Sequence, residues 1–292
     1  DPRNVIVNQF SEFSNYLIHY HCTGRALDRV FSELARSDPD LRLSAFVSAT
    51  GSAGTIGAGD YLKQRHGAKI AAVEAIECPT MLENGYGEHN IQGIGDKHIP
   101  LIHNVMNTDF VIGVSDRSSD SLNVLFNESA GRDYLVHRRK IDPGLLQQFA
   151  HIGLSGYANI VAAIKLAKHL ELGADDVVAT IATDSASLYP SERASFLARH
   201  YGGTFDGVNA GEVFGRDLDG IADDHLIELT YVDRRRVFNL GYYTWVEQQG
   251  VALEDFDRRK DPSFWKGLQD TIPAWDERIA EFNAETGAQH AQ

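Results

Sequence analysis

A glycine-rich segment between an apolar run and a helix-forming run constrains the fold more than any other part of this sequence. The apolar run covers residues 41–47, and a helical pattern begins near residue 55. A strand, a glycine-rich turn and a helix in this order direct several backbone N–H groups at one anion, and the helix dipole adds positive partial charge there. Small residues let the backbone approach phosphate oxygens closely. The segment therefore predicts a phosphate cradle made of Gly51, Ser52, Ala53, Gly54 and Thr55.

The cradle differs from two well-known nucleotide-binding patterns. It lacks the Gly-Lys-Ser/Thr ending of the P-loop, and it does not show the dinucleotide GxGxxG fingerprint in its usual register. A tight turn with glycines for packing only is the alternative interpretation. A nucleotide-binding protein is a weaker interpretation, because no acidic residue that could hold a ribose stands in clear register at the end of a second strand. Glu74 is the nearest candidate for this role.

Strand-like and helix-like runs alternate along most of the chain. Helices are predicted at residues 26–35, 55–66, 117–127 and 143–150 and after Gly153, and strands at residues 5–7, 41–48, 69–74, 109–115 and 176–182. Residues 77–107 are predicted to form a long loop, and residues from 203 onward a helical, aromatic-rich extension. This alternation predicts an α/β fold with a mostly parallel, doubly wound sheet. Ligands of such sheets bind beyond the carboxyl ends of the strands.

Composition narrows the class of protein. The chain has 292 residues, 43% of them hydrophobic, which is enough for one large or two modest domains. Its net charge of −14 argues against nucleic acid as the main partner, and Arg234-Arg235-Arg236, beside several aromatic residues, is better interpreted as a packed segment. No apolar run has the length of a membrane span, no signal peptide is recognised, and two cysteines are too few for a disulfide framework, so we expect a cytoplasmic protein without membrane association.

The histidines do not predict a metal site. His89, His98 and His103 fall in one loop, and His19 and His21 are two residues apart, but these spacings match no zinc pattern even with Cys78 as a fourth ligand. Cys78 is expected to be a small buried hydrophobic residue. We therefore predict no bound metal.

Five motifs resemble, in order, those of the fold type II pyridoxal-phosphate enzymes, the cysteine synthase and cystathionine β-synthase superfamily with the tryptophan synthase β fold. The resemblance spans about residues 5–195. Its motifs are Asn15 through Gly24, Gly51 through Thr55 in place of Gly-Thr-Gly-Gly-Thr, Ile91-Gln92-Gly93-Ile94-Gly95, the turn Gly153-Leu154-Ser155-Gly156-Tyr157-Ala158, and Thr183-Asp184-Ser185 with Tyr189. The aromatic extension suggests a longer, cysteine-synthase-like branch. The implied domains are the end of a small domain with a crossover segment (1–24), a large cofactor-binding α/β domain (25–202) and a helical extension (203–292).

The resemblance implies a chemistry and a set of roles. Residues 51–55 would hold the phosphate of pyridoxal 5'-phosphate, Ser185 would face its ring nitrogen, and the substrate side would be lined by Gln92, Gly93, Ile94 and Gly95. A neutral hydroxyl at the ring nitrogen gives a mild electron sink, which suits β-elimination or β-replacement on serine, acetylserine or cysteine, that is, lyase or transferase chemistry of amino-acid metabolism and cysteine biosynthesis. Ser185 as a capping residue, or a ring-nitrogen role one position away at Asp184, are alternatives. The family also implies a homodimer acting on a small amino-acid substrate.

The catalytic residue is unknown, because the family's Schiff-base lysine has no counterpart in its usual context. The lysines of this sequence are Lys63, Lys69, Lys97, Lys140, Lys165, Lys168, Lys260 and Lys266. Lys97, beside the 91–95 loop, is the only local substitute, and a solvated loop lysine is its default interpretation. We therefore expect the lysine to lie outside this chain, removed, omitted or carried by an N-terminal partner chain. A non-catalytic or regulatory subunit that binds a phosphate-containing ligand is the alternative.

Overall fold

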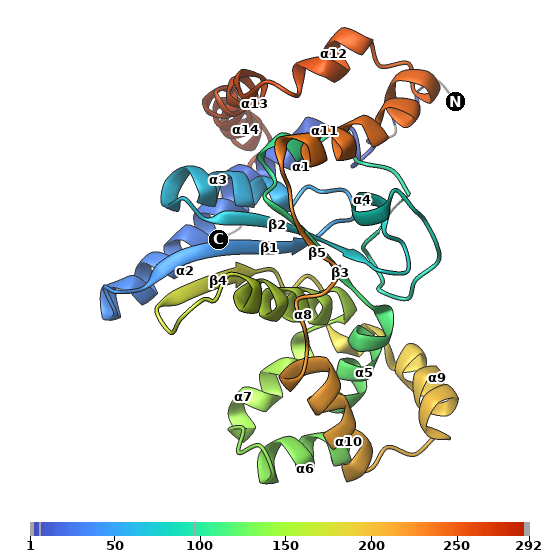
Figure 1. The fold of residues 1–292 in the computed structure, drawn as a ribbon. Helices are drawn as coiled ribbons and strands as arrows, with labels where there is room; N and C mark the ends of the chain where they lie inside the picture. The colour runs from blue at the N-terminus through green and yellow to red at the C-terminus, as the bar shows by residue number, and fades with distance from the viewer. Residues whose placement is uncertain (1–2, 6, 96, 289–292) are drawn as a thin grey trace.

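A central sheet organises the chain in a computed structural model that describes residues 3–5, 7–95 and 97–288 (Figure 1). In these residues five strands lie in the order β4-β1-β2-β3-β5. Four of them are parallel, namely β1 (Arg42–Ala49), β2 (Lys69–Ala75), β3 (Phe110–Val114) and β4 (Asp176–Thr180). The fifth, β5 (Leu226–Glu228), runs antiparallel to β3. The predicted α/β fold with a mostly parallel sheet is confirmed.

Helices connect the strands and follow the sheet. The first part of the chain contains α1 (Phe13–Ile18), a π-helical segment (His19–Thr23), α2 (Gly24–Ser37), α3 (Ile56–His66) and α4 (Thr80–Glu83). Between β3 and β4 lie α5 (Asp116–Asn127), α6 (Ser129–His137), α7 (Pro143–Gln148) and α8 (Leu154–His169). The remaining helices are α9 (Pro190–Tyr201), α10 (Gly207–Phe214), α11 (Tyr231–Leu240), α12 (Leu253–Arg258), α13 (Pro262–Gln269) and α14 (Ile272–Thr286).

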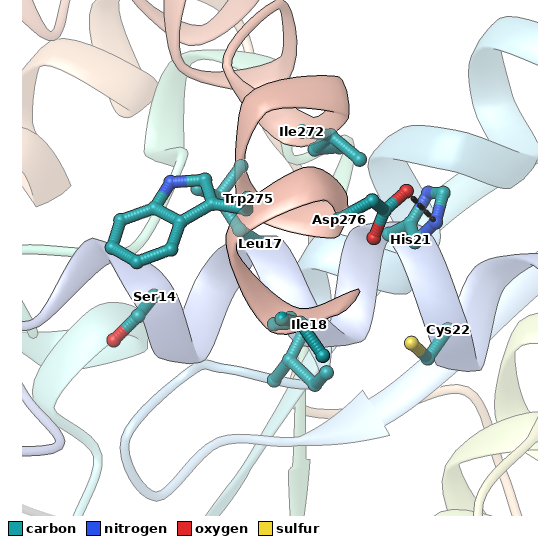
Figure 2. A pocket seen from close by; sticks show the side chains of 9 residues that line it. Ser14, Leu17, Ile18, His21, Cys22, Ile272, Trp275 and Asp276 are labelled. Carbon is teal, nitrogen blue, oxygen red and sulfur yellow. Dashed lines mark ion pairs between the residues drawn. The ribbon is translucent and has the colours of Figure 1, made fainter. Parts of the chain in front are cut away.

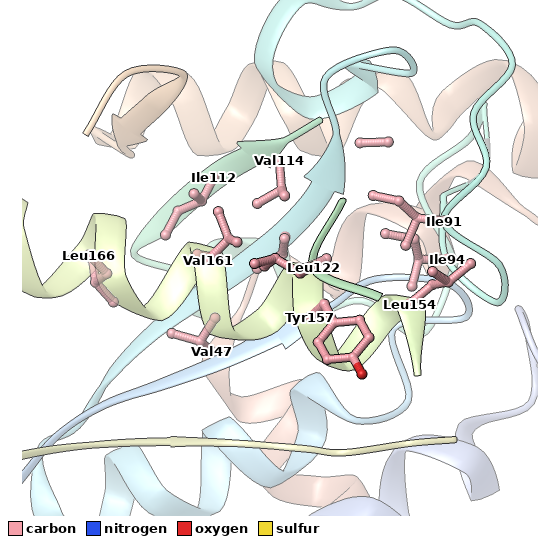
Figure 3. Close-up of a cluster of buried hydrophobic side chains, with 14 of the residues drawn as sticks. Val47, Ile91, Ile94, Ile112, Val114, Leu122, Leu154, Tyr157, Val161 and Leu166 are labelled. Atoms are coloured by element: carbon pink, nitrogen blue, oxygen red, sulfur yellow. The ribbon is translucent and has the colours of Figure 1, made fainter. Parts of the chain in front are cut away.

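Both faces of the sheet are buried, because successive side chains of a strand point to opposite faces. On one face, Val47, Val73 and Ile112 pack with Leu122 of α5 and Leu166 of α8 (Figure 3). On the other face, residues such as Phe46 and Ile70 pack against α3 and the C-terminal helices. Helices therefore cover the sheet on both sides, as a doubly wound fold requires (Figure 1).

The first predicted strand is wrong. Val5 and Val7 belong to no strand and are 86% and 72% exposed, and Ile6 lies outside the described residues. A run of three apolar residues is at the lower limit of strand length, so the pattern alone is a weak signal for a strand.

The predicted loop of residues 77–107 contains more structure than expected. It includes α4 and a 3-10 turn at Val105–Asn107. The buried carboxylate of Glu74, at the end of β2, accepts hydrogen bonds from the backbone N–H groups of Met81 and Leu82 at 2.9 and 2.8 Å. An anion in this position satisfies amides that a helix N-terminus leaves unpaired.

The predicted helical extension also contains a strand, β5, which the sequence did not predict. Residues after 203 complete both sides of the core: Ala210 and Val213 of α10 pack with α5, and Phe238, Trp245 and Phe256 pack on the opposite face of the sheet. Arg234 and Arg236 of α11 bond to residues 108–109 and 81–84, so the basic run is a packed segment. The domain boundaries remain a prediction.

A fully buried carboxylate joins four separate parts of the chain. Asp60 of α3 accepts hydrogen bonds from Tyr16 Oη at 2.8 Å, Asn104 Nδ2 at 2.7 Å and Asn107 Nδ2 at 2.7 Å. The Tyr16 oxygen in turn accepts a hydrogen bond from Gln269 Nε2 of α13 at 2.9 Å. Burial raises the pKa of the Asp60 carboxyl. The network attaches both the N-terminal and the C-terminal helices to α3.

We expect Tyr16→Phe to lower the free energy of unfolding by about 2 kcal/mol, because it leaves two buried polar groups without their partner. Tyr20→Phe is the matched control: its hydroxyl donates to Gln64 Oε1 at 2.6 Å in a solvent-exposed position, and we expect a loss below about 1 kcal/mol. Chemical denaturation measures both. Equal losses in the two variants would contradict a special role for the buried network.

The described part of the chain contains no single helix that is long and apolar enough to cross a membrane. One bent pair of helical segments, Pro143–His151 with Leu154–His169 at 119°, meets the length and composition criteria together.

Candidate active site

A cavity of about 280 Å³ lies where the order of the strands reverses, between the ends of β1 and β4. The chain leaves β1 toward β2 on one side and later returns to place β4 on the other side of β1. The carboxyl ends of two such strands diverge and leave a crevice, the usual ligand site of doubly wound sheets. The cavity is lined by His19, Ala49, Gly51, Ser52, Ala53, Thr55, Gln92, Gly93, Ile94, Ser155, Asn159, Thr183 and Asp184.

Asn159 of α8 holds the two strands apart at this point. Its Oδ1 accepts a hydrogen bond from the backbone N–H of Ala49 at 2.7 Å, and its Nδ2 donates to the carbonyl oxygen of Ile181 at 2.9 Å. The β1–β4 ladder is paired as far as Val47 and Thr180. The side chain of Asn159 therefore replaces main-chain pairing beyond that point, and the gap becomes the cavity.

The cradle lies between β1 and α3, as the sequence predicts. In the described part of the chain, the N–H groups of Gly51, Ser52, Ala53 and Thr55 have no hydrogen-bond acceptor, whereas the N–H of Gly54 donates to Ser52 Oγ at 3.4 Å. Several unpaired amides at the N-terminus of an 11-residue helix form an anion site.

Two backbone positions in the cradle are sterically special. A Cβ added to Gly51 would lie 2.8 Å from the carbonyl oxygen of Gly93, so a larger residue there would push the two loops apart. Ala53 has a φ of +62°, in the left-handed region that glycine adopts without cost. This positive φ explains why the family's motif has glycine at the position of Ala53. Alanine adopts the same conformation here at some conformational cost.

The loop of residues 89–95 closes the cavity from the other side. Gly93 and Gly95 have φ values of +82° and +73°, and the N–H of Gly95 donates to the carbonyl oxygen of Thr50 at 2.8 Å. Gln92, Gly93 and Ile94 line the cavity. Gly95 follows them and contacts Thr50, the residue after β1, instead. The loop and the cradle are thus joined directly by a main-chain hydrogen bond.

Two acidic residues of α5 anchor this loop. The N–H of Asn90 donates to Asp116 Oδ2 at 3.1 Å, and its Nδ2 donates to both carboxylate oxygens of Asp120 at 3.0 and 2.9 Å. Burial raises the pKa of the Asp120 carboxyl to about 6, although the hydrogen bonds from Asn90 oppose the shift.

We expect Asp120→Asn to change how stability depends on pH. Between the ordinary carboxyl pKa of 3.8 and the raised value of about 6, the folded protein binds more protons than the unfolded chain, so wild-type stability decreases as pH rises through this range. The variant lacks this contribution, which is on the order of 2–3 kcal/mol. Its unfolding free energy relative to wild type should therefore be higher at pH 8 than at pH 4.

Urea denaturation at both pH values measures this difference. Glu254→Gln, at an exposed residue of α12, is the control and should follow the wild-type pH dependence. A parallel pH dependence of Asp120→Asn and wild type would contradict the raised pKa.

Thr183 and Asp184, in the segment after β4, and Ser155, in the first turn of α8, bring hydroxyl and carboxyl groups to the cavity. Ser155 Oγ and Thr183 Oγ1 are 2.6 Å apart, and Asp184 accepts a hydrogen bond from Tyr189. Ser185 is not among the residues that line the cavity; its hydroxyl donates to the carbonyl oxygen of Ala150 at 3.2 Å and accepts the N–H of Ser187 at 3.3 Å. Ser185 therefore caps a short 3-10 turn, and its neighbour Asp184 borders the cavity.

No lysine is found among the described residues that line the cavity. Lys97 is exposed, and its ammonium lies 6.0 Å from the centroid of the Tyr86 ring. Lys63 and Lys165 bond to Asp109 and to Asp224 respectively.

The histidines are dispersed among different surroundings. His19 borders the cavity, His103 is buried with Nε2 3.0 Å from Thr108 Oγ1, and burial lowers the pKa of His103 to about 4. Among the described residues, no group of three His, Cys, Asp or Glu side chains is arranged to hold a metal ion.

Cys78 is buried, as expected, and Cys22 is exposed. The Glu74 carboxylate, engaged by α4 amides, has its pKa raised by burial to about 7.

A second cavity, of about 240 Å³, lies between α1 and α14 (Figure 2). Its wall is mostly apolar, with Leu17, Ile18, Trp275 and Ile279, and the His21–Asp276 pair at 3.6 Å lies at one side. It contains no cradle of backbone amides. The cavity at the ends of β1 and β4 is therefore the stronger candidate for chemistry.

Some lining residues could not be found from the sequence alone. His19 belongs to the 15–24 motif but has no role assigned from the sequence beyond a rejected metal site, and Asn159 gives no signal because it lies within an apolar helical pattern. Ser155 and Thr183 belonged to recognised motifs without an assigned role. Only their placement at the ends of β1 and β4 identifies them.

Parts of the chain are similar to known proteins. No protein-family model matches the chain. A cysteine synthase B from Campylobacter jejuni is 32% identical over 65% of this chain and 54% of its own length. A cystathionine beta-synthase from Saccharomyces cerevisiae is 29% identical over 64% of this chain and 34% of its own length. The chain thus spans about half, or less, of the relatives it matches.

Solved structures share the fold. A hydrogen sulfide-producing enzyme from Fusobacterium nucleatum matches with a TM-score of 0.51 at 23% identity, over 76% of this chain and 57% of its own. An O-acetyl serine sulfhydrylase isoform 3 from Entamoeba histolytica matches with a TM-score of 0.52 at 23% identity, over 71% and 52%. The resemblance inferred from the motifs is confirmed: this chain is a homologue of the cysteine synthases and cystathionine beta-synthases over about two thirds of its length.

Proposed function

We propose that this chain forms the cofactor-binding part of a pyridoxal-phosphate-dependent, cysteine-synthase-like enzyme. The reaction class is β-elimination or β-replacement on a serine, acetylserine or cysteine type of substrate. The single observation that carries the proposal is the cradle between β1 and α3, with unpaired N–H groups at Gly51, Ser52, Ala53 and Thr55, in the cavity that the 89–95 loop closes. The homology to cysteine synthases supports the choice of cofactor.

The described residues fit the phosphate of this cofactor. The unpaired N–H groups of the cradle and the α3 dipole match a dianion, and the missing Cβ atom at Gly51 lets the cradle and the Gly93 carbonyl approach each other closely. When bound, the cofactor supplies an electron sink that favours loss of a β-substituent. The protein contributes binding and orientation, with the substrate side lined by Gln92, Gly93, Ile94 and Gly95.

The ring-nitrogen position belongs to the segment of residues 183–185. Ser185 remains our assignment for it, by its place in the motif. For Ser185 to face the ring, its hydroxyl must leave the carbonyl oxygen of Ala150. Ser155 and Thr183, whose hydroxyls bond to each other, flank the same side of the cavity.

The lysine that would bind the cofactor covalently is proposed to lie outside these 292 residues. It would be supplied by an N-terminal portion or a partner chain, in a homodimeric cytoplasmic assembly that takes a small amino acid. The absence of lysine from the described lining of the cavity supports this placement.

We expect Gly51→Ala to weaken the binding of pyridoxal 5'-phosphate about tenfold or more, because the added methyl meets the Gly93 carbonyl and moves the cradle amides away from the phosphate. Equilibrium dialysis of the cofactor measures the affinity. Gly267→Ala is the matched control, since a Cβ at this α13 position meets no atom within 4 Å. Equal affinity of Gly51→Ala and wild type, with both folded by circular dichroism, would contradict the proposed phosphate site.

We expect borohydride reduction in the presence of pyridoxal 5'-phosphate to place the covalent adduct on a polypeptide other than this chain. The chain is purified with whatever accompanies it, treated at a stoichiometric amount of cofactor, and every polypeptide is weighed by intact-mass spectrometry. An adduct on a co-purifying chain supports a two-part enzyme. An adduct on a lysine of this chain, with Lys97 the first to inspect, contradicts the placement.

A non-catalytic, phosphate-binding subunit is the second candidate. The same lack of lysine in the cavity lining favours it. The two candidates differ in one measurement: adding a separately produced lysine-bearing portion of a cysteine synthase restores β-replacement activity only under the first.

A further inference from the structure

Asn15 of α1 reaches across to the cradle from a distant part of the sequence. Its Nδ2 donates to the carbonyl oxygen of Gln9 at 2.9 Å and to Ser52 Oγ at 3.0 Å. Its amide also lies against Gly54, where an added Cβ would be 2.5 Å from Asn15 Oδ1. The side chain therefore contacts two of the five cradle residues.

The orientation of this amide is fixed by chemistry. The carbonyl oxygen of Gln9 can only accept a hydrogen bond, so the group that faces it must be the NH2 of Asn15. The NH2 has two protons, and Ser52 Oγ receives the second. Ser52 must therefore act as an acceptor toward Asn15.

The hydrogen-bonding direction of the Ser52 hydroxyl is consequently fixed. Its oxygen accepts from Asn15 Nδ2 and, at 3.4 Å, from the N–H of Gly54, which uses both acceptor positions. Its own proton has no acceptor in the described part of the chain, and Ser52 lines the cavity. The hydroxyl is left as a donor for whatever occupies the cradle.

We propose that Asn15 is a positioning residue that holds the Ser52 hydroxyl as a hydrogen-bond donor to a phosphate oxygen of the bound ligand. The inference rests on the proposed function for the identity of that ligand. The relay runs from the Gln9 carbonyl through the Asn15 amide to the Ser52 hydroxyl. It selects ligand groups that accept hydrogen bonds, such as a phosphate dianion, and disfavours groups that only donate, such as an ammonium.

A double-mutant cycle tests the relay in the full chain. Wild type, Asn15→Ala, Ser52→Ala and the double variant are titrated with pyridoxal 5'-phosphate by equilibrium dialysis and with inorganic phosphate by 31P NMR. We expect Ser52→Ala to weaken both ligands about tenfold, the scale of one hydrogen bond to a charged group, and Asn15→Ala to weaken both severalfold. In the Ser52→Ala background, Asn15→Ala should have no further effect.

The control variant is Asn127→Ala, which removes another half-buried amide, bonded to Asn123 and Tyr157 away from the cavity, and should leave both affinities unchanged. Thermal unfolding of each variant confirms that it is folded under the binding conditions. A purely structural Asn15 would lower phosphate affinity equally with and without Ser52. Equal losses in the two backgrounds, or wild-type affinity in Asn15→Ala, therefore overturn the relay.

The two ligands separate this inference from the proposed function. Coupling seen with inorganic phosphate, in a chain that does not bind pyridoxal 5'-phosphate, keeps the relay and refutes the cofactor assignment. Binding of both ligands without coupling keeps the cofactor assignment and refutes the relay. A wild-type chain that binds neither ligand refutes both.

Discussion

The hydrogen bonds of Asn159 are the constraint on which the candidate site depends. Parallel strands normally continue their ladder until one of them ends, and a continuous ladder leaves no space between neighbours. Here a side chain from α8 takes over the N–H of Ala49 and the carbonyl of Ile181, so the strands separate without leaving buried polar groups unsatisfied. The cradle and the 183–185 segment then face each other across the gap.

The elements with a strong local signal were predictable from the sequence. The four parallel strands, α3 and the cradle follow from an apolar run, a glycine-rich turn and a helical pattern, which depend on neighbours in sequence. Of the two further motifs, Gln92, Gly93 and Ile94 and also Thr183 and Asp184 line the cavity, whereas Gly95 and Ser185 do not.

The remaining parts depend on contacts between residues far apart in sequence. Asn15 meets Ser52 and Asn159 meets Ala49 because the fold brings them together, and a single asparagine carries no pattern that announces such a contact. β5 has three residues and pairs with the edge of β3, whereas the apolar Val5 and Val7 belong to no strand. Residue type alone does not separate these two cases.

Three buried acidic side chains stabilise the fold by accepting hydrogen bonds from backbone N–H groups and from side-chain donors. Glu74, near the end of β2, accepts hydrogen bonds from backbone N–H groups of α4, and Asp120 bonds to Asn90 of the 89–95 loop. Asp60 of α3 bonds to Tyr16 of α1, which in turn bonds to Gln269 of α13. Each carboxylate is costly to bury, and burial raises the pKa of all three. The acidic composition of the chain is therefore partly structural, since these carboxyl groups hold loops and helices of the fold in place.

The pairing of β3 with β5 has a consequence for synthesis of the chain. Phe110 pairs with Glu228, so the edge of β3 waits for a partner that emerges more than a hundred residues later. At about 5–20 residues per second, that interval is roughly ten seconds on the ribosome. During this time an apolar strand presents free N–H and C=O groups, the kind of edge that templates pairing with another chain. This edge of the nascent chain is thus open to misassembly until residues 226–228 are made, a stage at which a chaperone would protect it.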